Sequence, residues 1–431
     1  MIHTNISVLE NGHLAFGGAD TTTLAKKYGT PLYLLDEDRV RENCRRYKDA
    51  IEKYFGKESL PLFASKALSV KEIYRIIASE GLGADIVSGG ELYTALAADF
   101  PADKLYFHGN SKTPEEIGYA LESGIGGFVV DNPDELELLS AECKKRNMAQ
   151  NILLRITPGI DPHTFKAVVT GNVDSKFGLP IETGQAIEFV EKALQYENLV
   201  LEGIHCHIGS QIFDYEPFTD AASIMLDFAL EVYNRFGIEL KKINLGGGIG
   251  VRYVSCDPHI CVDEIFKSIK QQLDCLIEER NMYQPTFLFE LGRYICADAG
   301  MTLYNVSGVK EIIGYKKYVL VDGGMGDNPR YALYGSKYTV YNCNKALAER
   351  DSIYTVGGRF CESDDLIGED MVCPQFKKGD LLAVAVTGAY NYSMASNYNK
   401  VPRPAMVAIS GGADKLIVRR ESYEDLIKNE I

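Results

Sequence analysis

The sequence predicts an α/β fold joined to an all-β one: a (β/α)8 TIM-like barrel with a C-terminal β-sandwich or Greek-key domain that also includes the N-terminal segment. Between residues 61 and 290, eight short β-rich runs alternate with longer segments of helical pattern, which is the order of a parallel sheet with crossover helices. A closed barrel of this kind takes roughly 250 residues, and the stretch is of that size. Beyond residue 292 the chain becomes rich in Val, Tyr, Thr and Gly with closely spaced turn signals, which is typical of an all-β domain.

Composition limits the classes of protein to consider. The chain has 431 residues, of which 46% are hydrophobic and 24% charged, as in folded globular proteins. Its formal net charge of -15 argues against nucleic acid and anionic membranes as partners, because both attract basic surfaces. We find no bilayer-spanning apolar run, no signal peptide and no CxxC pair among the ten cysteines. These features predict a soluble cytoplasmic protein with reduced thiols.

Each barrel strand is predicted from a β-rich run. The eight runs are PLFASKA (61–67), GADIVS (83–88), LYFHG (105–109), GFVVD (127–131), NILLRITP (151–158), LEGIHCHIG (201–209), KINLGGG (242–248) and TFLFELG (286–292). Helix starts lie between them, such as Thr113-Pro114 and Asn132-Pro133, where a capping side chain precedes a proline. An open doubly wound sheet is the alternative, but it wants fewer units and a glycine-rich turn after its first strand, which is absent here.

We expect three parts in the chain. Residues 1–36 form short strands that pack with the β domain, and residues 37–290 form the barrel. Residues 291–431 form the C-terminal β domain, which completes the active site and ends in a short acidic helix.

Unusual residues lie at the carboxyl ends of the predicted strands, where barrel active sites form. They are Lys66, Asp85, His108, Arg155, His205, His207, Gly246 to Gly248, Glu290 and Arg293. Lys66 closes an apolar strand. It either reaches out of the barrel mouth into water or is partly desolvated, so that its neutral amine forms a Schiff base.

The glycine triplet suggests an anion site. Gly246, Gly247 and Gly248 expose backbone N–H groups that bind phosphate, to which Ser210 adds a hydroxyl. Three glycines also form ordinary tight turns.

His205 and His207 share one strand face, because strand side chains alternate. They are compatible with a metal pair, with an imidazole stacked on an aromatic cofactor, or with hydrogen-bonded core histidines. We find no third ligand for a metal. The segment from Cys256 through His259 to Cys261 matches no common zinc spacing.

Glu290 is an acid in an apolar strand, and a buried carboxylate needs a partner. Arg293 is one possibility, and a protonated ring nitrogen of a cofactor is the other. Two segments of the β domain, one beginning at Cys361-Glu362 and one around Tyr390, are polar or aromatic and resemble loops that complete a site.

Together these segments resemble the diaminopimelate decarboxylases, pyridoxal-phosphate enzymes that share the alanine racemase-like barrel fold, over nearly the whole chain. The matching segments are FASKAL, ADIVSGGELYTAL, HGNSKTPEE, RITPGIDPHTF with TGNVDSKFG, GIHCHIGSQI, NLGGGIG, ELGR, DGGMGDNPRYALYG, CESDD and GAYNYSMASNYNKVPRP. The chain departs from the family pattern at Leu291, where Pro is usual, and in the Gly-Gly-Arg-Phe segment before Cys361.

The resemblance implies a role for each matching residue. Pyridoxal 5'-phosphate would be bound by Lys66, Asp85, His207, Ser210, Gly248, Glu290, Gly292, Arg293 and Tyr390, and the substrate by Arg293, Arg330, Tyr334, Glu362 and Tyr390. Lys66 would form the Schiff base, His207 would stack on the ring and Glu290 would pair with the pyridine nitrogen. Cys361 and Glu362 would come from the partner subunit of a head-to-tail homodimer, with Cys361 as the proton donor. No metal is implied.

The implied reaction is decarboxylation of meso-2,6-diaminopimelate to L-lysine and CO2, the last step of lysine biosynthesis. An acid at the ring nitrogen keeps that nitrogen protonated and favours carbanion chemistry, whereas a racemase of this fold places Arg there. Arg330 and Arg293 suit a distal carboxylate and Glu362 a distal ammonium. The rival functions are a related decarboxylase acting on ornithine, lysine or arginine, a non-catalytic relative, and a barrel metalloenzyme.

Overall fold

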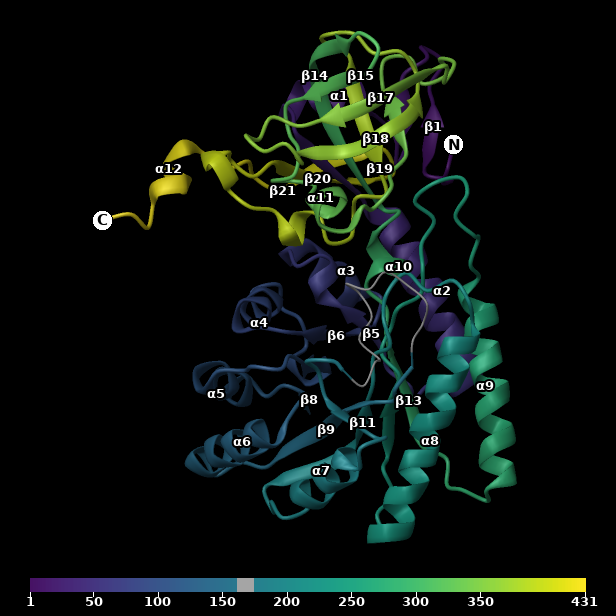
Figure 1. Cartoon of the computed structure of the whole chain (residues 1–431). Helices are drawn as coiled ribbons and strands as arrows, with labels where there is room; N and C mark the ends of the chain where they lie inside the picture. The colour runs from purple at the N-terminus through teal and green to yellow at the C-terminus, as the bar shows by residue number, and fades with distance from the viewer. Residues whose placement is uncertain (161–173) are drawn as a thin grey trace. The chain divides into compact units, whose positions relative to one another are not determined.

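The computed structural model describes residues 1–160 and 174–431 and divides into two compact units (Figure 1). One unit, here the barrel unit, comprises residues 44–250 and 260–292; the other, here the β-rich unit, comprises residues 1–43, 251–259 and 293–431. The middle of the RITPGIDPHTF and TGNVDSKFG region lies outside the described residues.

The barrel unit contains the predicted closed barrel of eight parallel strands. They are β5 (Pro61–Ala64), β6 (Gly83–Ile86), β7 (Leu105–Phe107), β8 (Gly127–Val130), β9 (Gln150–Thr157), β11 (Leu199–His205), β12 (Lys242–Asn244) and β13 (Thr286–Glu290). Each pairs with the next in parallel. The barrel closes where β13 pairs with β5, at Phe289 opposite Pro61. A short strand, β10 (Leu179–Pro180), extends the sheet beside β9.

Helices surround these strands (Figure 1). They are α2 (Glu37–Phe55), which continues from the β-rich unit, α3 (Lys71–Ser79), α4 (Gly89–Leu96), α5 (Pro114–Ser123), α6 (Pro133–Arg146), α7 (Gln185–Ala193), α8 (Glu216–Phe236) and α9 (Val262–Glu279). α5 begins as predicted: Thr113 caps it in a reciprocal pair with Glu116 and Pro114 is its first residue. No helix among the described residues is long and apolar enough to cross a bilayer.

Apolar side chains fill the barrel away from its polar end. One buried cluster joins Leu62, Tyr106, Val129, Leu153 and Leu288, each from a different strand. Because strand side chains alternate, the neighbours of these residues face the surrounding helices, which explains why the predicted runs are almost continuously apolar.

The β-rich unit confirms the predicted all-β region. Its largest sheet runs in the order β18 (Leu366–Cys373), β17 (Ser352–Gly357), β15 (Lys316–Val321), β14 (Gly300–Ile312), β4 (Leu32–Asp36), β20 (Ala405–Ser410) and β21 (Ala413–Val418). β14 also pairs with β19 (Leu381–Ala385), which pairs with β16 (Val340–Asn342). β4 comes from the N-terminal segment and lies between β14 and β20.

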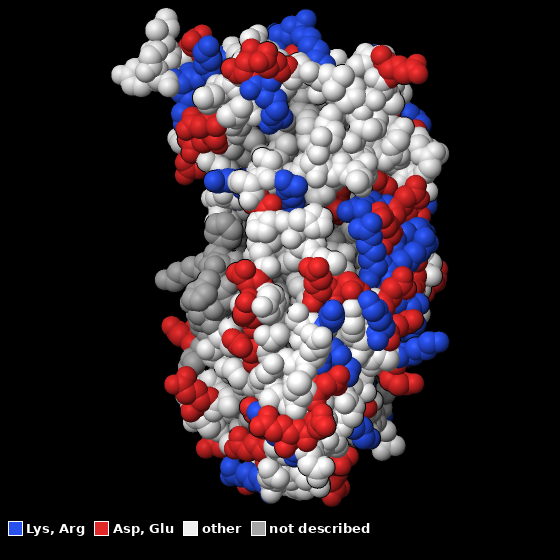
Figure 2. Space-filling model, turned by 90° about the vertical axis from the view of Figure 1, so that its right-hand side faces the viewer, with Lys and Arg blue, Asp and Glu red and all other residues white. Residues whose placement is uncertain are grey.

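Smaller elements complete this unit. They are β1 (Ile6–Val8), β2 (Leu14–Phe16), β3 (Ala19–Asp20), α1 (Thr21–Tyr28), α10 (Arg293–Cys296), α11 (Arg330–Tyr334) and α12 (Tyr423–Ile427), the last in the segment predicted as a terminal helix. On the molecular face of Figure 2, acidic and basic side chains are interspersed.

Candidate active site

Lys66 lies just past the carboxyl end of β5, in a single 3-10 turn that spans Ser65–Ala67. Lys66 is exposed, although Ser65 and Ala67 on either side are buried. The Ser65 N–H donates to Asp85 Oδ1 over 3.1 Å, and the Ser65 hydroxyl donates to Glu91 Oε2 over 2.9 Å. Two acids therefore fix the turn and leave the amine of Lys66 accessible.

Asp85 is buried at the end of β6, opposite Ala64. Burial raises the pKa of its carboxyl well above the ordinary value, the negative charge of Glu290 raises it further, and Lys66 works in the opposite direction. The lysine and this acid are therefore electrostatically linked across β5 and β6.

The glycine triplet after β12 forms a turn whose first two N–H groups are already bonded. Gly246 N–H donates to Asn244 Oδ1 over 2.9 Å, and Gly247 N–H donates to His207 Nδ1 over 3.3 Å. This leaves Gly248 as the member of the triplet that suits an anion.

Side chains cannot replace these glycines. Gly246 and Gly248 have φ values of +68° and +121°, which favour glycine. A Cβ on Gly247 would lie 1.9 Å from the carbonyl oxygen of Glu290. At the end of β13, a Cβ on Gly292 would lie 2.9 Å from the Cβ of Ala64. The strand ends thus approach one another as closely as backbone allows.

Glu290 is buried at the end of β13 and receives three polar contacts. Asn244 Nδ2 donates to Oε1 over 2.7 Å, and His205 Nε2 lies 3.3 Å from Oε2. His108 Nε2 lies 2.9 Å from Oε1, at an angle unsuited to a hydrogen bond.

The charge state of this cluster follows from its surroundings. Burial opposes ionisation of Glu290, but the imidazoles of His108 and His205 outweigh burial and hold the pKa of the carboxyl well below its usual range. Burial lowers the pKa of His205 to about 4 and also lowers that of His108. At neutral pH the cluster is an ionised carboxylate beside two neutral imidazoles.

The structure separates the roles of His205 and His207. β11 ends at His205, and His207 lies beyond it against the glycine turn. Among the described residues, the one group of three His, Cys, Asp or Glu side chains close enough to share a cation is His108, His205 and Glu290, within 4.8 Å of one another. It does not include His207, and the Asn244 amide donates to one of the same carboxylate oxygens, which opposes a cation there.

In the β-rich unit, two arginines approach the ring of Tyr390. The guanidinium carbon of Arg293 lies 4.9 Å from the ring centre, and that of Arg330 lies 5.1 Å from it. Arg330 also lies 5.0 Å from the ring centre of Tyr334, and Arg293 donates to the hydroxyl of Tyr253 over 2.8 Å. The structure therefore brings together four of the predicted substrate-binding residues.

Arg330 is buried, and its Nε has no hydrogen-bond partner among the described residues. Asn328, two residues earlier, is fully buried with neither side-chain polar atom bonded to any described residue. Buried polar groups without partners are rare in proteins, so this region has the character of a site for a polar ligand.

Cys361 and Glu362 lie in an exposed loop of the β-rich unit. The Cys361 N–H donates to Asn399 Oδ1 over 2.8 Å, and the Tyr398 hydroxyl donates to the carboxylate of Glu362. The rings of Phe360 and Tyr398 stack, with centres 6.2 Å apart. The segment after Tyr390 therefore supports the loop that carries the thiol.

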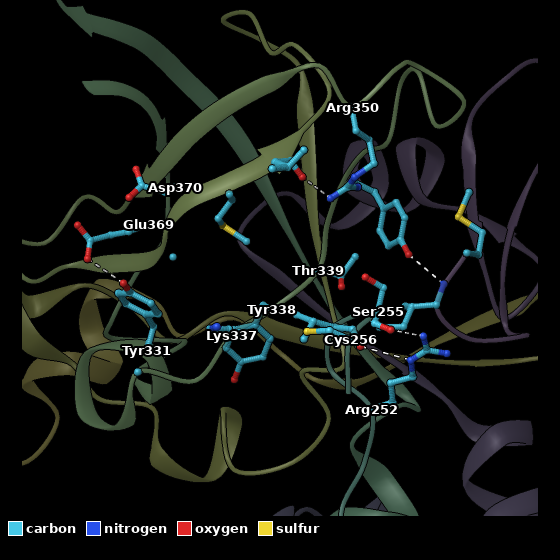
Figure 3. A pocket seen from close by; sticks show the side chains of 18 residues that line it. Arg252, Ser255, Cys256, Tyr331, Lys337, Tyr338, Thr339, Arg350, Glu369 and Asp370 are labelled. Carbon is cyan, nitrogen blue, oxygen red and sulfur yellow. Dashed lines mark hydrogen bonds between the residues drawn. The ribbon is translucent and has the colours of Figure 1, made fainter. Parts of the chain in front are cut away.

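A cavity of about 740 Å³ also lies within the β-rich unit (Figure 3). Arg252 and Arg350 lie on one side of it and Glu369 and Asp370 on the other. It contains none of the predicted site residues. Both arginines already donate to main-chain carbonyls, so this cavity is not the best candidate for the active site.

Several residues around Glu290, Arg293 and Cys361 could not be assigned to the site from the sequence. Asn244 and Tyr253 have no pattern that marks them. Tyr398 and Asn399 belong to the polar and aromatic segment around Tyr390, but nothing in the sequence gives either residue a role of its own. His108 lies at a predicted strand end, and its place beside Glu290 follows only from barrel closure.

Comparisons with known proteins agree with this geometry. Residues 37–297 match the family described as "Pyridoxal-dependent decarboxylase, pyridoxal binding domain". The diaminopimelate decarboxylase of Bacillus methanolicus is 44% identical over 97% of each chain. That of Bacillus subtilis (strain 168) is also 44% identical, over 98% of this chain and 96% of its own.

Solved structures agree as well. The crystal structure of diaminopimelate decarboxylase from m. jannaschii in complex with L-lysine superposes with a TM-score of 0.92 at 36% identity, covering 99% of this chain and 98% of its own. The closed barrel, the lysine at its rim and the full-length similarity lead to one assignment: the chain belongs to the pyridoxal-dependent decarboxylases, among the diaminopimelate decarboxylases.

Proposed function

We propose that this protein removes CO2 from meso-2,6-diaminopimelate to give L-lysine, with Lys66, Glu290 and Cys361 as its central reacting and supporting groups. The observation that carries the proposal is the buried, ionised Glu290 at the same end of the barrel as the exposed Lys66. The names of the relatives support the substrate.

The residues of the barrel unit fit pyridoxal phosphate, the cofactor of this family. Glu290 is an anion whose hydrogen-bond donors are neutral, so a protonated ring nitrogen suits it. The Gly248 turn suits a phosphate, and an exposed lysine amine suits an aldehyde. The residues present therefore suit the ring nitrogen, the aldehyde and the phosphate of this cofactor.

When bound, pyridoxal phosphate supplies a conjugated ring that takes up the electron pair of a breaking carbon–carbon bond. Lys66 would hold the cofactor covalently, and Asp85 fixes the turn that presents its amine. Glu290 would keep the proton on the ring nitrogen. His207 would stack on the ring. Ser210, Gly248 and the Gly292-Arg293 backbone would bind the phosphate, with Tyr390 nearby.

The remaining roles concern the substrate. Arg330 and Arg293, beside Tyr334 and Tyr390, bind the distal carboxylate by charge-assisted hydrogen bonds. Glu362 binds the distal ammonium. Cys361 gives its thiol proton to the carbon that has lost CO2. We propose that Cys361 and Glu362 serve the active site of a partner subunit in a homodimer.

We also propose a division of the chain into three parts and a cytoplasmic location. Residues 1–36 form the N-terminal strands, residues 37–290 form the cofactor-binding barrel, and residues 291–431 form the domain that completes the active site. The protein works in the cytoplasm.

The experiment is an absorbance titration of the purified protein with pyridoxal phosphate, followed by assay of CO2 release. Wild-type protein is expected to gain a visible absorbance band that borohydride removes, and to release CO2 from meso-diaminopimelate. Lys66→Ala is expected to lose both the band and nearly all turnover. Retention of both by this variant would overturn the assignment of Lys66.

A decarboxylase for ornithine, lysine or arginine is the second candidate, because Glu362 alone would bind a distal cation. Assay of CO2 release from each amino acid separates the two. Faster release from ornithine, lysine or arginine than from meso-diaminopimelate would overturn the proposed substrate.

A further inference from the structure

Asn244 connects two parts of the candidate cofactor site. Its side chain is fully buried. Its Oδ1 accepts the Gly246 N–H over 2.9 Å, and its Nδ2 donates to Glu290 Oε1 over 2.7 Å. One amide therefore holds the glycine turn and the carboxylate at a fixed separation.

The backbone strengthens this connection. The Glu290 N–H donates to the carbonyl of Gly246 over 2.7 Å, so β12 and β13 are joined here by both main chain and side chain. The orientation of the Asn244 amide is also determined, because only its NH2 group can donate to a carboxylate and only its oxygen can accept from the glycine N–H.

His205 holds the other oxygen of the carboxylate, with Nε2 at 3.3 Å from Oε2. Its Nδ1 is buried and has no hydrogen-bond partner among the described residues. The proton of the neutral ring therefore lies on Nε2, since the other tautomer would bury an unpaired donor and turn a lone pair toward the carboxylate. The ring of His108 packs edge-on against His205, with centres 4.8 Å apart, and limits its rotation.

We propose that Asn244 and His205 are positioning residues for the reaction. They hold the Glu290 carboxylate where the ring nitrogen is bound, and Asn244 keeps that point in register with the phosphate-binding turn. This inference rests on the proposed function, and it adds two residues that act through Glu290 without touching the substrate.

The test is a double-mutant cycle with Glu290→Gln. Asn244→Leu and His205→Leu are each expected to weaken pyridoxal phosphate binding and to lower kcat by about 10- to 100-fold, as expected for a misplaced catalytic group. KM should change much less, because the substrate ends bind elsewhere. In the Glu290→Gln background His205→Leu should have no further effect, and Asn244→Leu should have a further effect only on cofactor binding, through the turn at Gly246. His205→Gln should recover most of the loss, because its amide can replace the Nε2 donor.

The chain offers a matched control in Asn342. It is also fully buried, its Oδ1 accepts a backbone N–H, from Asn344, over 3.1 Å, and its Nδ2 donates to the carboxylate of Asp380 over 2.9 Å. Asn342→Leu should reduce the unfolding midpoint of the cofactor-free protein much as Asn244→Leu does. The cofactor affinity and kcat of the Asn342→Leu variant should stay within about twofold of wild type.

Three results would overturn the inference. The first is that Asn244→Leu and His205→Leu lower only the unfolding midpoint. The second is that their effects add fully to that of Glu290→Gln. The third is that metal analysis finds an ion that His205→Leu removes. Failure of the proposed function looks different, because wild-type protein itself would then neither bind the cofactor nor release CO2.

Discussion

At the scale of single residues, Arg330 is a buried cation with a hydrogen-bond donor available to a ligand. It lies against the rings of Tyr334 and Tyr390, and its Nε has no partner among the described residues. Arg330→Ala should raise KM for meso-diaminopimelate by about 10- to 100-fold, because a hydrogen bond to a charged group contributes about 1.5–3 kcal/mol. Cofactor affinity should persist.

The control for this substitution is Arg75→Ala, at an exposed position on α3. Steady-state kinetics of both variants provide the measurement. An unchanged KM in Arg330→Ala would contradict the role of this arginine.

Asp327 is the residue whose titration should affect stability. It lies in the turn before α11, receives the Tyr304 hydroxyl and is fully buried, and burial raises its pKa to about 7. The unfolded chain releases this proton near pH 4. Between these values the folded protein binds more protons than the unfolded one, so the contribution of Asp327 to stability falls as pH rises from about 4 to 7, by at most about 1.4 kcal/mol per pH unit.

We therefore expect the stability of wild type relative to Asp327→Asn to decrease over this pH range. Urea unfolding midpoints at several pH values give the measurement, with the exposed Asp49→Asn as the control. A difference between wild type and Asp327→Asn that does not change with pH would contradict the raised pKa.

Candidate site residues stand out in the sequence where they coincide with a strand end. Lys66 and Glu290 were identified because a charged residue interrupts an apolar run there. Asn244 and His205 could not be connected to Glu290, since their contacts join residues 46 and 85 positions apart and depend on the order in which the barrel closes. Hydrophobic periodicity contains no information on such contacts.

At the scale of elements, the turn after β12 shows the tightest packing constraint. A Cβ on Gly247 would overlap the Glu290 carbonyl at 1.9 Å. Gly247→Ala should therefore destabilise the protein by about 1–3 kcal/mol or more and weaken cofactor binding.

Gly308→Ala provides the matched comparison, because a Cβ there meets no atom within 4 Å. It should be neutral or stabilising by up to about 1 kcal/mol. Urea unfolding of the cofactor-free variants measures both, and equal stability of the two would contradict the packing argument.

The alternation of β-rich and helical segments was enough to predict all eight barrel strands. Their ends were less predictable: the run 242–248 stops being a strand at Asn244, because the glycines after it leave the ladder. Leu291, a departure from the family pattern, donates its N–H to the Leu62 carbonyl over 3.1 Å. A proline there would lack this hydrogen bond.

At the scale of the whole molecule, the proposed shared active sites can be tested by mixing subunits. Lys66→Ala and Cys361→Ala are each expected to be nearly inactive. When the two are unfolded together and refolded, half of the dimers should contain one chain of each kind, and each mixed dimer should contain one intact site.

Activity should therefore return to about one quarter of the wild-type value. Wild-type protein treated in the same way is the control for refolding yield, and sedimentation analysis reports the dimer. A mixture as inactive as its components would mean that Lys66 and Cys361 serve sites on the same chain.

The place of β4 in its sheet has a consequence for synthesis on the ribosome. This buried and mostly apolar strand of five residues leaves the exit tunnel early, yet its partners β14 and β20 begin at residues 300 and 405. The nascent chain therefore carries β4 without its strand partners, and so prone to aggregation, throughout translation of the barrel. We expect arrested chains that end before β20 to be cut by protease near residues 32–36, and released full-length chains to resist.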